Sequence, residues 1–408
     1  MARIVVIGSG AREHAIVKAL RRYGDREILA IPGNPGIARE ARCVPAQPSL
    51  ADAALPAKPD LVVVGPEQPL ADGFADRMAA EKVPCFGPLA AAARIEASKA
   101  FAKEIMLAAR VPTAEAAVFE DPASAREYAK ARGACVVKLD GLAAGKGVIV
   151  ADDGAQAAHA VEELWRPGAK LLIEERLEGR EISVIAICDG ESVLPLPPAR
   201  DHKRLLDDDQ GPNTGGMGAV CPPSDATPEL IDSTVRTVLE PTVREMAKRG
   251  TPFVGALYAG LMLTRNGPRV LEFNCRLGDP EAQAILLRLR SDPLPLFLAA
   301  AQGRIQGQKP VWDPRTAVAV VLAAHGYPGT PRSLDPIEIE VEESDDLWVL
   351  HAGTRMHEGR LVTGGGRVLT VAALGAGPAQ ARARAYGAAA HVKFAGMQSR
   401  SDIAAAEG

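Results

Sequence analysis

The chain has 408 residues, of which 24% are charged, and its formal net charge is −4. Such a length exceeds one ordinary hydrophobic core and predicts about three folding units. The charge balance argues against non-specific binding to nucleic acid, which needs a basic surface. The sequence contains no run of about eighteen apolar residues, so we expect no membrane-spanning helix.

The cysteines and the first residues indicate a compartment. The six cysteines are scattered without a C-x-x-C pair, which predicts reduced thiols and neither disulfides nor a zinc site. Residues 1–8 are strand-like and too short for a secretory signal. We therefore expect a cytoplasmic protein that binds small molecules but neither nucleic acid nor membrane, as a monomer or small homo-oligomer.

The first part of the chain alternates strands with helices. Short β-rich runs lie at 4–7, 27–31, 61–64 and 83–86, each followed by glycine or proline. This alternation predicts a parallel, doubly wound sheet, with ligand-binding loops at the carboxyl ends of its strands.

The turn Gly8-Ser9-Gly10 suggests a dinucleotide site, but the G-x-G-x-x-G fingerprint fails. Glu13 occupies the position of the third glycine in this fingerprint. The strand that ends at Ile31 also lacks the acidic residue that would bind the ribose. A dehydrogenase is therefore disfavoured.

A lysine and a glycine-rich turn follow at 137–148. Gly141, Gly145 and Gly147 let the backbone bring its N–H groups close to an anion, and β-branched residues on both sides predict a hairpin. A Walker A loop needs Ser or Thr after its lysine and then a helix, whereas this chain has Gly147 and then a predicted strand, so the segment is not a Walker A loop. The glycines alone are equally compatible with an ordinary tight hairpin.

Residues 171–177 form an apolar run with two acids. We expect the edge of this strand to bind adenine through its backbone and Glu181 to reach ribose hydroxyls. Lys99 and Lys103 share one face of an Ala-rich helix, so one of them can point to phosphate. A solvated surface is the alternative for that pair.

The run 270–275 predicts a metal-binding strand. Glu272 and Asn274 share one face because strand periodicity is two, whereas Leu271 and Phe273 face the other way. A carboxylate and an amide oxygen suit Mg²⁺, whose shell is completed by phosphate oxygens. A half-buried strand with outward polar residues is the alternative, and the glycine hairpin makes it the weaker one.

Beyond 312–314, residues 317–323, 347–350 and 367–371 predict strands and 379–390 a helix. The predicted units are an N-terminal α/β domain with a doubly wound parallel sheet (1–111), two lobes (112–193 and 194–308), and a small α+β C-terminal domain (309–408).

Several segments together resemble the ATP-grasp ligases, and among them the glycinamide ribonucleotide synthetase (phosphoribosylamine–glycine ligase) family. They are 8–15, 64–70, 98–103, 138–148, 201–204, 211–218 and 272–281. The resemblance covers nearly the whole chain, and 211–218 and 272–281 are its most specific parts. It implies that the two lobes form an ATP-grasp core.

The family's reaction uses ATP and Mg²⁺ or Mn²⁺. Glycine is activated as glycyl phosphate, and the amine of 5-phosphoribosylamine then attacks it. The resemblance assigns ATP to Lys103, Lys138, Gly141, Leu142, Gly145, Lys146, Gly147, Glu174, Glu175, Leu177 and Glu181, and the metal to Glu272 and Asn274. It assigns the substrates to Gly10, Arg12, Glu13, Lys203, Gly215, Gly216, Met217, Gly218 and Asp279, with Arg276, Lys138 and Asp201 as catalytic residues.

Two positions depart from the family pattern. Ala11 replaces a glycine in the opening turn, so we expect its methyl group to obstruct direct backbone contact with phosphate. The strand at 256–263 lacks the acid that ATP-grasp enzymes often carry there.

Two rivals to this family stay open. Another ATP-grasp carboxylate–amine ligase or carboxylase would share the hairpin and the metal strand, but should lack the segments at 201–204 and 211–218. A nucleotide sensor without enzyme activity would have little use for Arg276 beside Glu272 and Asn274.

Overall fold

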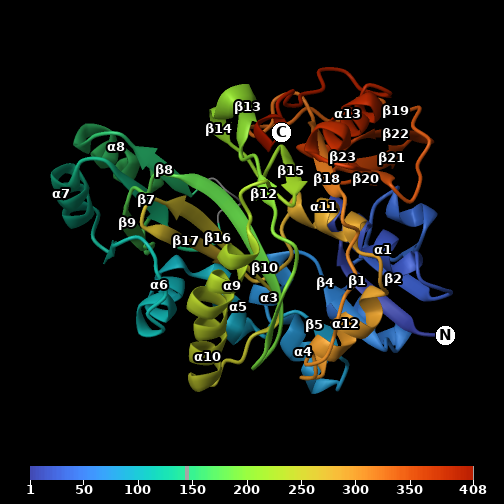
Figure 1. Cartoon of the computed structure of the whole chain (residues 1–408), viewed down its shortest axis with the longest axis horizontal. Helices are drawn as coiled ribbons and strands as arrows, with labels where there is room; N and C mark the ends of the chain where they lie inside the picture. The colour runs from blue at the N-terminus through green and yellow to red at the C-terminus, as the bar shows by residue number, and fades with distance from the viewer. Residues whose placement is uncertain (143–146, 408) are drawn as a thin grey trace.

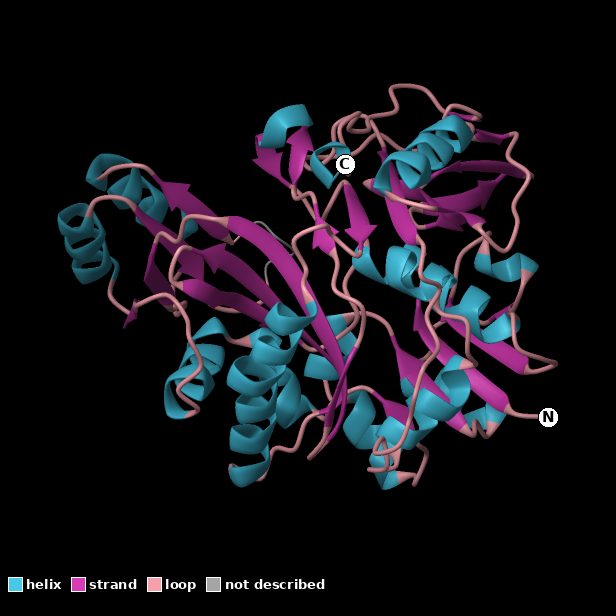
Figure 2. Ribbon diagram, viewed as in Figure 1, coloured by secondary structure: helices cyan, strands magenta, loops and turns pink. Residues whose placement is uncertain are grey.

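The computed structural model describes residues 1–142 and 147–407. Three sheet-containing parts surround a central lobe (Figures 1 and 2). No helix of the described residues is long and apolar enough to cross a membrane.

The N-terminal part is built on a five-stranded parallel sheet in the order β3-β2-β1-β4-β5. Its strands are β1 (Arg3–Gly8), β2 (Glu27–Pro32), β3 (Arg42–Cys43), β4 (Leu61–Val64) and β5 (Cys85–Phe86). Its helices are α1 (Ala11–Arg21), α2 (Leu50–Ala54), α3 (Glu67–Ala71), α4 (Phe74–Ala80) and α5 (Ala90–Ala97). Residues of β1 belong alternately to two different hydrophobic clusters, because helices cover both faces of the sheet. The predicted parallel, doubly wound sheet is confirmed.

The lid sheet is antiparallel, in the order β6-β9-β7-β8. It contains β6 (Ala116–Phe119), β7 (Cys135–Leu139), β8 (Val148–Ala151) and β9 (Leu171–Glu175), with helices α7 (Pro122–Arg132) and α8 (Gly154–Leu164). Both helices cover one face of this sheet at the left of Figure 1. The hairpin predicted around the glycines is confirmed by β7 and β8, which pair directly.

The central lobe carries the sheet β11-β10-β16-β17, which is antiparallel throughout. Its strands are β10 (Arg180–Asp189), β11 (Val193–Pro195), β16 (Val254–Thr264) and β17 (Gly267–Asn274). The neighbouring helices are α6 (Lys99–Ala108), α9 (Pro228–Thr234), α10 (Glu240–Lys248) and α12 (Pro293–Ala301), whereas α11 (Glu281–Arg288) packs against α1.

Strand β17 contains an irregularity directly before the predicted metal ligands. Gly260 pairs with Glu272, but the next residue of β16 pairs with Val270, so Leu271 is skipped. Val270 and Phe273 are therefore both buried in one hydrophobic cluster, 0% and 3% exposed. The expectation that Leu271 shares a face with Phe273 is wrong, because a bulge interrupts the twofold alternation.

The C-terminal strands form one sheet with earlier parts of the chain, in the order β12-β15-β18-β23-β20. Its members are β12 (Arg200–Asp201), β15 (Gly218–Cys221), β18 (Thr316–Ala323), β20 (Leu347–His351) and β23 (Arg367–Gly375), with helix α13 (Pro378–Ala389) packed on it. Small pairs are β13 (Arg204–Leu206) with β14 (Gln210–Asn213), β21 (Thr354–His357) with β22 (Arg360–Thr363), and β19 (Glu338–Ile339) with β24 (Val392–Lys393). The strands on either side of the 202–217 segment, β12 and β15, thus pair with each other, and β15 joins them to C-terminal β18. The four domain limits stay predictions.

Leu322 tests the packing of this shared sheet. It is 1% exposed on β18, so Leu322→Ala should leave a cavity and lower the free energy of unfolding by about 2–5 kcal/mol. Urea denaturation followed by circular dichroism measures the shift. The control Val118→Ala removes a side chain that is 46% exposed, and an equal effect of the two variants would contradict this packing.

Candidate active site

A buried carboxylate lies between two lysines where the lid sheet meets helix α6. Glu174 on β9 binds Lys103 Nζ at 3.1 Å and Lys138 Nζ at 2.7 Å, and all three residues are at most 7% exposed. Burial lowers the pKa of Lys103 more than Glu174 raises it. Two cations around one carboxylate leave an excess positive charge, which suits a polyphosphate.

Lys138 also connects the lid sheet to the predicted metal strand. Its Nζ donates to the carbonyl of Leu271 at 3.0 Å, directly before Glu272. The skipped residue of the β17 bulge thus supplies a carbonyl to this lysine. The positive charge and the metal strand are therefore held side by side.

Glu272 is ionised in a strongly cationic environment. Burial raises the pKa of its carboxyl group, but Lys203, Lys138 and Lys99 outweigh burial and bring it below the usual value. Among the described residues no group of three or more His, Cys, Asp or Glu side chains converges as a metal site. Glu272 and the Asn274 amide fit a hard cation that takes its remaining ligands from phosphate and water.

The predicted substrate run at 201–204 is half-buried and includes residues of β12 and β13. Lys203 Nζ lies 2.7 Å from a Glu181 carboxylate oxygen and 3.7 Å from Glu272 Oε1. Burial, only partly offset by Lys203, raises the pKa of Asp201 to about 8. The structure therefore brings Asp201, Lys203 and Glu181 beside the metal strand.

The glycine loop at 215–218 is fixed by C-terminal residues that sequence reasoning missed. The Gly215 N–H donates to the Tyr327 hydroxyl at 2.8 Å, and Arg367 Nη1 donates to the Gly215 carbonyl at 2.6 Å. Arg367 also lies 3.2 Å from an Asp279 carboxylate oxygen. Gly216 has φ +110°, and a Cβ there would lie 2.4 Å from Pro280, which explains the glycine. Met217 and Gly218 follow it as buried residues.

The opening turn closes around a carboxylate of its own helix. Glu13 accepts the Gly10 N–H at 2.5 Å and the Arg12 Nε–H at 2.6 Å. Ala11 is 1% exposed and its methyl group packs in the hydrophobic core, while the expectation about backbone contact with phosphate stays a prediction. Asp279 lies beside this turn, 3.6 Å from the position of a Cβ on Gly10.

Arg276 follows the metal strand and is surrounded by acceptors. It binds Glu67 through Nε at 3.2 Å and Glu96 through Nη2 at 3.1 Å. Nη2 also lies 3.2 Å from the Asn274 amide oxygen. Sequence reasoning gave neither acid a role, because both lie about 200 residues before Arg276 and no local pattern connects them.

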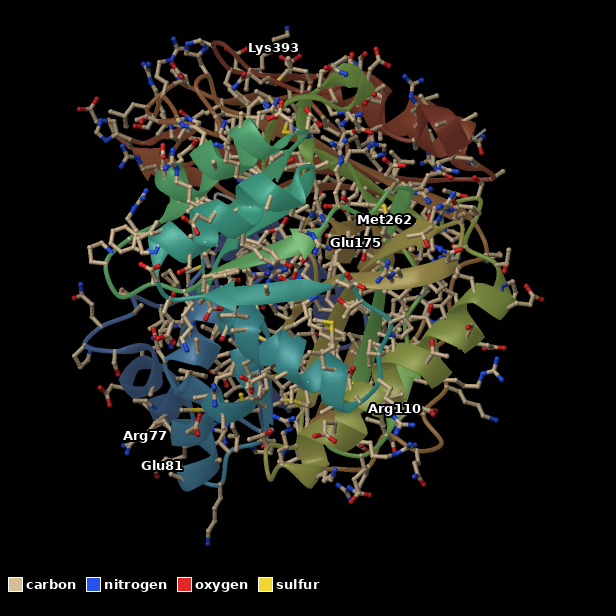
Figure 3. The ribbon with its side chains drawn as sticks, turned by 90° about the vertical axis from the view of Figure 1, so that its left-hand side faces the viewer. Arg77, Glu81, Arg110, Glu175, Met262 and Lys393 are labelled. Carbon is tan, nitrogen blue, oxygen red and sulfur yellow. The ribbon has the colours of Figure 1, made fainter. Side chains whose placement is uncertain are left out.

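One expectation about adenine is wrong. Strand β9 is not an edge over 171–175, because β6 pairs on one side and β7 on the other. The strand ends at Glu175, so a backbone contact with adenine is predicted only after it, from Arg176 onward, where Leu177 lies. Glu175 itself pairs with Arg269 at 3.0 Å, and Figure 3 shows it close to Met262, which pairs with Arg269 across the strands.

The hairpin turn is described only in part. Lys99 Nζ donates to the Gly141 carbonyl at 2.8 Å, and the Leu139 N–H donates to the Gly147 carbonyl at 2.8 Å. Leu142 is 36% exposed. Gly145 and Lys146 lie outside the described residues.

Known proteins share the sequence and the fold of this chain. Models for the N domain, the ATP-grasp (A) domain and the C domain of phosphoribosylglycinamide synthetase match residues 2–96, 97–282 and 317–406. The chain belongs to the phosphoribosylglycinamide synthetase family. It is 49% identical to a phosphoribosylamine–glycine ligase of Streptomyces coelicolor, covering 99% of each chain. It is 47% identical to the Caulobacter vibrioides ligase, covering 98% of this chain and 97% of the relative.

Solved structures agree with the family assignment. A phosphoribosylamine–glycine ligase from Thermotoga maritima superposes with a TM-score of 0.87 at 34% identity, covering 98% of this chain and 100% of the other. A biotin carboxylase domain from Hydrogenobacter thermophilus matches with a TM-score of 0.73 at 18% identity, covering 97% of this chain and 91% of the other, which shows the shared fold alone. The predicted ATP-grasp architecture is confirmed.

Asp201 gives a prediction for pH dependence. Because its pKa is raised in the folded chain, the folded state retains a proton that the unfolded state loses, and stability falls as pH rises from the ordinary value of 3.8 to about 8. Asp201→Asn removes this titration. We expect the unfolding midpoint of the variant to rise relative to the unmodified chain across that window.

Differential scanning fluorimetry over this pH range measures the difference. Asp232→Asn, at an exposed position on α9, is the control. A midpoint difference for Asp201→Asn that does not change with pH would contradict the raised pKa.

Proposed function

We propose that this chain joins glycine to 5-phosphoribosylamine, using ATP, to give glycinamide ribonucleotide, ADP and phosphate. The observation that carries the proposal is the bond from Lys138 Nζ to the Leu271 carbonyl at 3.0 Å. It holds the excess positive charge of Lys103 and Lys138 against the strand of Glu272 and Asn274. The named relatives support glycine and phosphoribosylamine as the substrates.

In the first step, a carboxylate oxygen of glycine attacks the γ-phosphorus of ATP and ADP leaves. Lys103 and Lys138 bind the phosphates, and positioning with charge neutralisation supplies most of the catalysis. Glu272 and Asn274 would hold Mg²⁺ or Mn²⁺, which would supply neutralisation of the phosphate charge. The backbone after Glu175, including Leu177, binds adenine, and Glu181 binds ribose.

The product of this step is glycyl phosphate, which reacts readily with water. Arg276 and the 215–218 loop hold the glycyl group, since a guanidinium fork binds two oxygen atoms. The hairpin that carries Gly141 and Gly147 excludes water from the mixed anhydride.

In the second step, the amine of phosphoribosylamine attacks the glycyl carbonyl carbon, and phosphate leaves. Asp201, Lys203 and Asp279 line the phosphoribosylamine side together with Gly10, Arg12 and Glu13. Asp279 suits this side because burial raises its pKa less than Arg367 and Arg12 lower it, so the side chain is an ionised acceptor for sugar hydroxyls.

The cytoplasm is the proposed compartment, and small molecules are the proposed partners. All six cysteines are free in the described structure, which suits a reducing compartment.

Phosphate release tests the function. Purified protein receives ATP, Mg²⁺ and glycine, with freshly prepared phosphoribosylamine added or withheld. We expect phosphate release only when both co-substrates are present. Release that is independent of glycine, or that needs bicarbonate instead, would support another ATP-grasp enzyme.

Glu272→Ala tests the metal assignment in the same assay. The loss of one electrostatic stabiliser should lower kcat by roughly two orders of magnitude or more. The control Glu338→Ala, at an exposed position on β19, should leave kcat unchanged. A Glu272→Ala variant with near-normal turnover would contradict the assignment.

A further inference from the structure

Arg276 has more negative partners than one guanidinium needs. The carboxylates of Glu67 and Glu96 both bind it, at 3.2 and 3.1 Å, and its side chain is only 19% exposed. Burial raises the pKa of Glu96 more than Arg276 lowers it, whereas the pKa of Glu67 is lowered, so Glu67 is the more readily ionised of the two acids. An ionised carboxylate beside Arg276 suits a cationic group of a ligand.

The two acids have different surroundings. Glu96 has a 9% exposed side chain and also accepts the Cys275 N–H at 2.7 Å, so it anchors the backbone after β17. The Glu67 side chain is 29% exposed and follows β4, at the carboxyl end of the parallel sheet. Glu67 is therefore the acid that an incoming ligand can reach.

Building on the proposed function, we infer that Glu67 binds the ammonium group of glycine while Arg276 binds its carboxylate. The ion pair between Glu67 and Arg276 matches the opposite charges of an amino acid zwitterion. When glycine binds, its carboxylate replaces Glu67 on the guanidinium, and Glu67 takes the ammonium. Every charge keeps a partner throughout this exchange.

The chemistry favours glycine over phosphoribosylamine as the ligand of Glu67. An ionised carboxylate stabilises a protonated amine. The amine of phosphoribosylamine must be unprotonated to attack, whereas the amine of glycine must not compete as a nucleophile. Burial raises the pKa of Glu67, but Arg276 outweighs burial and brings it below the usual value, so the acid is ionised.

Glu67→Gln tests this role through selectivity. A charge-assisted hydrogen bond of about 1.5–3 kcal/mol corresponds to a rise in KM for glycine of about 10- to 150-fold. KM for ATP and for phosphoribosylamine should change less than about twofold. Acetate, which lacks the ammonium, should inhibit competitively with glycine at least as well as before.

Two further variants separate ligand binding from support of the structure. Glu96→Gln should lower kcat and the unfolding midpoint while the relative affinity for glycine and acetate is preserved. Glu81→Gln, directly after α4, removes a solvent-exposed partner of Arg77 that lies 3.2 Å away and is labelled in Figure 3. This variant should change none of these constants.

Several results would overturn the inference. Equal losses of glycine and acetate affinity in Glu67→Gln would mean that Glu67 only orients Arg276. A changed KM for phosphoribosylamine with unchanged KM for glycine would assign Glu67 to the other substrate. Failure of this inference and failure of the proposed function are distinguishable. If the unmodified enzyme shows no glycine-dependent phosphate release, the proposed function itself is overturned.

Discussion

The site depends on Glu174, one buried carboxylate shared by two lysines. It makes burial of Lys103 and Lys138 tolerable, yet it neutralises only one of their two charges. The three side chains come from α6, β7 and β9, so the two ion pairs of Glu174 also join the lid sheet to the central lobe. The bond from Lys138 to Leu271 then fixes this charge against the metal strand. A polyanion with a bound cation is the ligand that balances both sides.

The other charged side chains of the site also alternate in sign. Lys203 lies between Glu181 and Glu272, and Arg276 lies between Glu67 and Glu96. Each internal ion pair keeps a charged side chain satisfied until a ligand of like charge replaces its partner. The C-terminal sheet contributes by fixing the 215–218 loop through Tyr327 and Arg367. Elements from all parts of the chain therefore meet at this candidate site.

Local patterns predicted the elements that local physics determines. The parallel sheet, the glycine hairpin and the strand with Glu272 and Asn274 all follow from periodicity and glycine placement. The bulge at Leu271 escaped prediction because it depends on pairing with β16. The central position of β9 likewise depends on β6 and β7. Glu67, Glu96 and Arg367 reach the site only through long-range packing, so their contacts escaped prediction even though Glu67 lies in the family-like segment 64–70. The ATP-site and substrate assignments stay predictions.

A crystal structure with a non-hydrolysable ATP analogue, Mg²⁺ and glycine tests the central claim most directly. The account predicts phosphate oxygens within hydrogen-bond distance of Lys103 and Lys138 Nζ, and Mg²⁺ bound to Glu272 and Asn274 at about 2.0–2.1 Å. A nucleotide bound away from the two lysines, or a metal ion held by other side chains, would contradict it.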